Sequence, residues 1–146
     1  MKKLKEIFKK YREIILYILF GGLTTIVSFL SAGVAKWLLE AAGGSTHVVS
    51  TVSTVFSWVC AVTFAYLTNR VWVFESTARG TAAILKEAAA FYGGRVFTLL
   101  FETAFMWVGN SLLQLDYWWT KIAANVVVLV LNYIISKLLV FRNTKQ

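Results

Sequence analysis

The sequence has 146 residues, of which 58% are hydrophobic and 16% aromatic, with no proline and a mean hydropathy of +0.67. A soluble domain of this length could not bury so much apolar surface, so the composition indicates an integral membrane protein and excludes a separate soluble domain. The formal net charge of +8 does not indicate a nucleic-acid interface, because the basic residues stand between apolar runs.

Four apolar runs are long enough to cross about 30 Å of hydrocarbon as helices. They predict an all-α fold within one domain of residues 1–146, with transmembrane helices at residues 14–39, 48–73, 89–113 and 118–140. Residues 1–13 are predicted to form an amphipathic basic segment on anionic lipid. A cleavable signal peptide is disfavoured, because the first apolar run is too long for one. Gly43-Gly44 is expected to end the first helix, in one of two short outer turns at residues 40–47 and 110–117.

The distribution of basic residues predicts the orientation, because Lys and Arg resist translocation. All of them except Lys36 and Lys121 fall in the amino-terminal segment, in or beside the central loop, or near the carboxyl end, where Lys137, Arg142 and Lys145 stand. The pattern therefore predicts that both termini and the central loop are cytoplasmic.

Two motifs occur twice, once in each half of the chain. Phe20-Gly21-Gly22 is matched by Tyr92-Gly93-Gly94, and residues 66–74 are matched by residues 133–141. Since each half contains two spans, both halves have the same orientation in the membrane. The sequence therefore predicts two parallel-repeat helical hairpins, related by a pseudo-twofold axis along the membrane normal.

These motifs resemble the GtrA-like family of small four-helix membrane proteins. The resemblance rests on three segments: residues 20–25 with Ser28-Phe29, the block that ends with residues 69–74, and residues 132–141. It implies a multi-pass protein of the bacterial cytoplasmic membrane. The implied task is translocating a polyprenyl-phosphate-linked sugar from the cytoplasmic to the outer leaflet, for glycosylation of cell-surface polysaccharide or teichoic acid. Asn132 corresponds to Ala65 in the first block, so a site built on it would be asymmetric.

Two charged residues lie inside the third predicted span. A carboxylate near mid-membrane costs about 2.5 to 3.5 kcal/mol on insertion scales, so Glu102 is expected to face protein or water. Arg95 lies two helical turns earlier on the same face, and the two could share a polar cavity. Alternatively, Arg95 reaches the cytoplasmic interface, and Glu102 is protonated or pairs with a neighbouring helix.

Further polar candidates lie on the second and fourth spans. Lys121, Asn125 and Asn132 recur on one helical face; the asparagines could bind sugar hydroxyls or a phosphate, or join helices, while Lys121 is expected to anchor the outer interface. Cations at the inner helix ends could meet a lipid phosphate or serve as ordinary anchors. The predicted substrate-binding residues are Arg95, Glu102, Asn125, Asn132, Arg70 and Lys137.

Residues Ser50, Ser53, Thr54, Ser57 and Ala61 form a stripe of small side chains that predicts close helix packing. The sequence contains no nucleophile triad, phosphate-cradling glycine loop or metal-ligand cluster, and its one cysteine, Cys60, excludes an intramolecular disulfide. We therefore expect a protein that is not an enzyme and needs no metal or cofactor.

The expected partners are the polyprenyl-phosphate-linked sugar, membrane lipids and a membrane glycosyltransferase, with no nucleic acid. A homo-oligomer is expected, because four helices enclose little volume. Two other functions remain open: a non-transporting anchor or regulator of a glycosyltransferase, and a small proton-coupled multidrug exporter. Exporters of that class carry their glutamate in the first span, where this sequence has no buried carboxylate.

Overall fold

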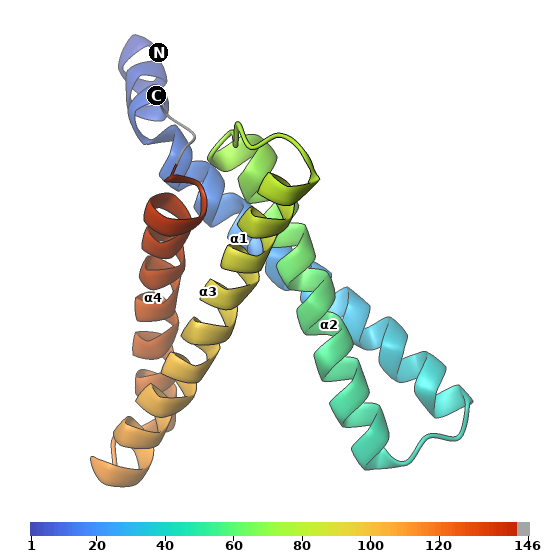
Figure 1. Cartoon of the computed structure of the whole chain (residues 1–146). Helices are drawn as coiled ribbons and strands as arrows, with labels where there is room; N and C mark the ends of the chain where they lie inside the picture. The colour runs from blue at the N-terminus through green and yellow to red at the C-terminus, as the bar shows by residue number, and fades with distance from the viewer. Residues whose placement is uncertain (143–146) are drawn as a thin grey trace. The chain divides into compact units, whose positions relative to one another are not determined.

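The computed structural model describes residues 1–142, apart from the side chain of Lys2. These residues form α1 (Lys2–Ala41), α2 (Thr46–Thr68), α3 (Thr81–Trp107) and α4 (Tyr117–Ile135), and contain no strand (Figure 1). The last three helices continue as π-helical turns: η1 (Asn69–Val73), η2 (Val108–Leu112) and η3 (Ser136–Val140). The predicted all-α fold is confirmed. The predicted cytoplasmic cation Lys145 lies outside the described residues.

The chain divides into two compact units, one over Met1–Glu75 and one that begins at Ser76. In the first, α1 packs against α2 and η1; in the second, α3 packs against α4 and η3 (Figure 1). The division falls between the two halves that the repeat predicts. The pair of helical hairpins is therefore confirmed, and the pseudo-twofold relation between them stays a prediction.

Three of the helices are long and apolar enough to cross a membrane: α1, α2 with η1, and α4 with η3. The chain is thus a multi-pass membrane protein. Helix α3 is not in this set, although its 27 residues would extend about 40 Å. Its charged residues lower its hydropathy, so the span predicted at residues 89–113 depends on how those charges are accommodated.

Helix α1 begins at Lys2 and runs without interruption for 40 residues. Residues 2–13 form the first turns of this same helix, and the place of residues 1–13 on anionic lipid stays a prediction. At 1.5 Å per residue α1 is about 60 Å long, roughly twice the hydrocarbon thickness. Its basic start consequently extends beyond the apolar part of the bilayer.

The two hairpins turn by different local means. Gly43 has a φ of +78°, which favours glycine, and the Gly44 amide donates to the Leu39 carbonyl at 2.9 Å, so the predicted glycine stop is confirmed. In the second hairpin, the Asp116 carboxylate accepts hydrogen bonds from the amides of Trp118 and Trp119, at 3.0 and 3.1 Å. Asp116 is thus the N-cap of α4.

The packing face of α2 consists of every fourth residue. The residues at this spacing are all buried and run from α2 into η1: Val49, Ser53, Ser57, Ala61, Ala65, Asn69 and Val73. Val62, Tyr66 and Thr68 of α2 are buried beside them. Side chains four apart lie above one another on a helix, and small ones let two helices approach closely in lipid. The predicted small-residue stripe is corrected in part, because Ser50 and Thr54 are exposed.

The same face recurs on α4 and η3, in the register of the sequence repeat. Its members are buried or half-buried: Thr120, Ala124, Val128, Asn132, Ser136 and Val140. Each stripe is followed by a buried phenylalanine against an aromatic ring of the hairpin's first helix. The centroids of Tyr17 and Phe74 are 6.4 Å apart, and those of Phe91 and Phe141 are 6.1 Å apart. The duplication therefore extends from sequence motifs to tertiary contacts.

Replacing Gly94 with alanine should destabilise the second hairpin, because a Cβ there would lie 2.7 Å from Cγ2 of the β-branched Ile135. Overpacking of this kind costs about 1 to 3 kcal/mol. Gly93→Ala is the matched control, since its Cβ would have no atom within 4 Å. Thermal unfolding of the detergent-purified variants measures the difference, and equal melting temperatures would contradict the packing described.

The predicted orientation can be tested by labelling single cysteines in a Cys60→Ala background. Ser45→Cys, in the turn of the first hairpin, should react with a membrane-impermeant maleimide on intact cells. Thr77→Cys, between the hairpins, should react only after permeabilisation, because the basic central loop is predicted to be cytoplasmic. The reverse pattern would show that both hairpins are inverted.

Candidate functional site

An ion pair joins the two helices of the second hairpin. The Lys121 Nζ on α4 donates to Oε1 of Glu102 on α3, and the two side chains are 37% and 20% exposed, respectively. Charges at this depth are costly in lipid unless they are paired or hydrogen-bonded. Of the alternatives for Glu102, pairing with a neighbouring helix is the one observed, and Lys121 does more than anchor the outer interface.

A second polar contact joins α3 and α4. The Thr98 hydroxyl, whose residue is 2% exposed, lies 2.8 Å from Oδ1 of Asn132 and 3.1 Å from the Arg95 carbonyl. Asn132 occupies the position on the packing face that Ala65 holds in the first hairpin. An amide therefore stands where the first hairpin has a methyl group, and its oxygen accepts a hydrogen bond across the interface.

Arg95 is half-buried, and its guanidinium lies 4.7 Å from the centroid of the Phe91 ring. This geometry is that of a cation–π interaction. Within residues 1–142, Arg95 and Glu102 form no ion pair with each other. Glu102 pairs with Lys121 and Arg95 lies against an aromatic ring, and the polar cavity between Arg95 and Glu102 stays a prediction.

The remaining predicted site residues lie elsewhere. Asn125 is exposed on α4 and does not join the contacts between α3 and α4. Arg70 in η1 is half-buried, and Lys137 in η3 is exposed, with its Nζ 3.2 Å from the Tyr133 hydroxyl. Arg70 and Lys137 hold equivalent places, each in the π-helical turn of its own hairpin.

Asn69, at the start of η1, was singled out in the sequence only as part of a motif. It is 3% exposed; its Nδ2 donates to the Ala65 carbonyl at 2.7 Å, while its Oδ1 accepts no hydrogen bond within the described residues. Unpaired buried amide oxygens are uncommon. The signal in the sequence was its place in the repeated block, where the second hairpin has Ser136.

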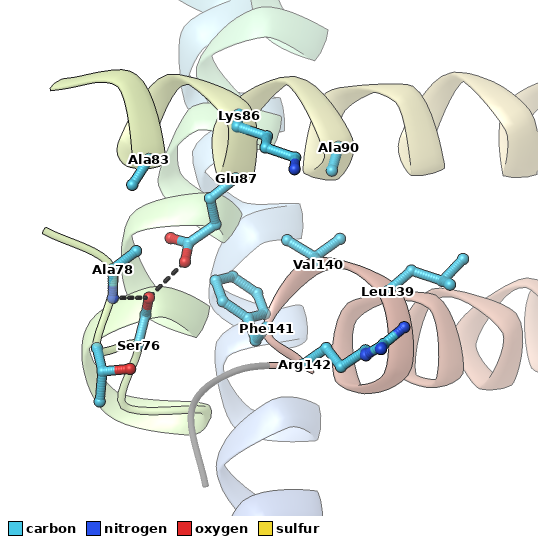
Figure 2. A pocket seen from close by; sticks show the side chains of 11 residues that line it. Ser76, Ala78, Ala83, Lys86, Glu87, Ala90, Leu139, Val140, Phe141 and Arg142 are labelled. Carbon is cyan, nitrogen blue, oxygen red and sulfur yellow. Dashed lines mark hydrogen bonds between the residues drawn. The ribbon is translucent and has the colours of Figure 1, made fainter. Parts of the chain in front are cut away.

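The second hairpin also contains a cavity of about 630 Å³ that the sequence did not indicate. Figure 2 shows it where the segment from Ser76 to Ala78, the start of α3 and the end of η3 meet. Glu87, only 7% exposed, points from α3 toward Ser76 and accepts a hydrogen bond from the Ser76 hydroxyl. From the sequence alone, Lys86 and Arg142 indicate only the orientation of the chain in the membrane.

Comparison with known families shows which family the protein belongs to. Residues 16–141 match the GtrA/DPMS transmembrane domain family, which is nearly the whole chain after the basic start. The chain belongs to this family, so the predicted family is confirmed. No solved structure matches the chain.

The chain is also similar to curated bacterial proteins over most of its length. It is 30% identical to "Cell wall teichoic acid glycosylation protein GtcA" of Listeria monocytogenes, over 99% of this chain and 100% of the relative. It is 33% identical to the protein of that name from Listeria monocytogenes serovar 1/2a, over 91% and 87%. It is 33% identical to the membrane protein YwcD of Bacillus subtilis, over 90% and 98%.

Glu102→Gln should destabilise the protein, because it leaves the Lys121 ammonium without its anion. We expect a loss of about 1 to 3 kcal/mol, between the values for exposed and buried pairs. The exchange Glu102→Lys with Lys121→Glu should recover much of that loss. Thermal unfolding in detergent measures each variant.

Glu40→Gln serves as the control for this prediction. It breaks the Lys36–Glu40 pair, whose atoms are 3.8 Å apart and whose side chains are 63% and 56% exposed. An exposed pair is worth at most about 1 kcal/mol, so this change should be almost neutral. If the charge exchange is as unstable as Glu102→Gln, the contact does not stabilise the hairpin.

Proposed function

We propose that this protein moves a polyprenyl-phosphate-linked sugar from the cytoplasmic to the outer leaflet, where the sugar is used to glycosylate teichoic acid. The likeness to GtcA proteins supports the biological context, because the match extends over nearly all of both chains. The printed names of those relatives concern glycosylation of teichoic acid. Movement of the lipid-linked sugar is the step that we add.

The contacts between α3 and α4 carry this proposal. A sugar crossing the bilayer needs hydrogen-bond partners for its hydroxyls, since unpaired polar groups in hydrocarbon cost several kcal/mol each. Glu102, Lys121 and Asn132 offer carboxylate, ammonium and amide groups at a helix interface. They are paired with protein groups when no sugar is present, so the empty protein does not leave them unsatisfied in lipid.

Translocation would then proceed by exchange of hydrogen-bond partners. Sugar hydroxyls would replace the contacts from Lys121 to Glu102 and from Thr98 to Asn132, while Arg95 offers a charge to the phosphate. The isoprenoid chain stays in lipid, because it is as apolar as the acyl chains. No covalent bond changes in this process, so it requires no catalytic group, in keeping with a protein that is not an enzyme.

The basic ends of the hairpins suit the cytoplasmic side of such a process. In the proposed orientation, with both termini inside, Arg70 and Lys137 lie at the inner headgroup level and attract the phosphate of the carrier. A second copy of the chain would enclose the path more fully than one copy can. A membrane glycosyltransferase on the outer side would consume the delivered sugar.

Leaflet exchange in reconstituted vesicles tests the proposal. Wild-type protein should transfer a short-chain polyprenyl-phosphate hexose between leaflets, and Glu102→Gln, Arg95→Ala and Asn132→Ala should each slow the transfer about tenfold or more, as loss of a charged hydrogen-bond partner predicts. Asn125→Ala is the matched control, because it makes the same chemical change on the exposed face of α4. It should slow transfer less than twofold.

Full transfer by all three variants would exclude the proposed path. The principal alternative is an anchor that recruits a glycosyltransferase without moving lipid. In that case wild-type vesicles would show no exchange, and the purified protein would retain an active transferase in a pull-down whatever residue stands at position 102. Proton release on adding hydrophobic cations would instead indicate the exporter.

A further inference from the structure

The two hairpins carry different charged residues at the end where the second helix of each hairpin stops. In the first, the Arg12 guanidinium lies 2.6 Å from the Glu75 carboxylate, and its other nitrogen donates to the Trp72 carbonyl at 3.3 Å. Glu75 directly follows Phe74, the residue after η1. An ion pair therefore joins the first helix of this hairpin to the residue that follows its second helix.

At the matching end of the second hairpin, the charged residues are arranged differently. The residue after Phe141 is a cation, Arg142, in the place that the carboxylate Glu75 holds after Phe74. The carboxylate of the second hairpin is Glu87, on α3. The Ser76 hydroxyl donates a hydrogen bond to Glu87 and accepts one from the Ala78 amide at 3.2 Å. Both charged residues line the cavity of about 630 Å³.

The lining of this cavity has three chemical parts. Lys86 and Arg142 supply exposed cations, Ser76 and Glu87 supply polar groups on the buried side, and Leu139, Val140 and Phe141 form an apolar wall (Figure 2). The volume lies in the range of about 300 to 1,000 Å³ that is usual for small-molecule sites. The N-cap residue of α3 is Gly80, which gives the helix no side-chain cap and so favours an anion nearby.

We infer that this cavity binds the phosphate–sugar head of a membrane lipid, as the cytoplasmic loading site of the proposed translocase, and this inference rests on that proposed function. The phosphate meets Lys86 and Arg142, which have no ion pair among the described residues. A sugar hydroxyl donates to Glu87, because a carboxylate has about four acceptor positions and can bind Ser76 and a ligand together. The apolar wall contacts the sugar ring and the first isoprene unit.

Binding to the full-length purified protein tests this site with four probes. They are a short-chain isoprenyl phosphate carrying one hexose, the same phosphate without sugar, the isoprenyl hexoside without phosphate, and inorganic phosphate. The double variant Lys86→Gln with Arg142→Gln should weaken both isoprenyl phosphates about tenfold or more, as loss of charge-assisted hydrogen bonds predicts, and hardly change the hexoside. Glu87→Gln should weaken only the sugar-bearing probes, about threefold to tenfold.

Arg79→Gln is the matched control, because it removes a cation from the same loop that does not line the cavity. It should change each affinity less than twofold, and thermal unfolding confirms that each variant is folded. Equal losses in Arg79→Gln and the double variant would overturn the site, since they would reflect only bulk charge. Inorganic phosphate binding as tightly as the isoprenyl phosphate hexose would also overturn it, because the lipid head would then contribute nothing.

The site and the proposed function can fail separately. If wild-type vesicles show no exchange but binding still depends on Lys86 and Arg142, the translocase proposal fails and the headgroup site stands. If the double variant binds and transfers the lipid as wild type does, while Glu102→Gln does not transfer it, the site fails and the translocase stands.

Discussion

The cost of leaving a polar group unpaired in hydrocarbon governs this structure. Water cannot hydrogen-bond a side chain in the bilayer core, so each buried charge or amide needs a partner within the protein. Helix α3 carries Arg95 and Glu102 and is not among the helices apolar enough to cross a membrane, and α4 carries the lysine that pairs with Glu102. The Glu102–Lys121 and Thr98–Asn132 contacts therefore make α3 and α4 mutually dependent.

Duplication explains what the hairpins share, and divergence explains what each can do. Both use a stripe of small residues at every fourth position, a π-helical turn and a closing pair of aromatic rings. Hydrophobic attraction between helices is weak in lipid, so this close packing supplies much of the association. At equivalent positions of the two hairpins, Ala65 is only buried in the helix packing, whereas Asn132 also accepts a hydrogen bond from Thr98.

The polar features of the second hairpin occur at two depths. The contacts between α3 and α4 lie along the helices, whereas Glu87, Lys86 and Arg142 line a cavity at the end where α3 begins and η3 ends. A carrier lipid must engage a transporter first at a headgroup and then along the bilayer. This arrangement suits both steps of the proposed translocation.

The sequence by itself determined the helices, the hairpin duplication, the glycine stop and the family, because apolar periodicity, charge distribution and repeated motifs are local properties of the chain. It also marked Glu102 as costly in lipid and Asn132 as part of a polar helix face. It did not reveal the partner of Glu102, the exposure of Asn125 or the cavity beside Glu87. Those depend on how two helices meet, since rotation and offset at an interface decide which side chains face each other, and only the tertiary structure specifies them.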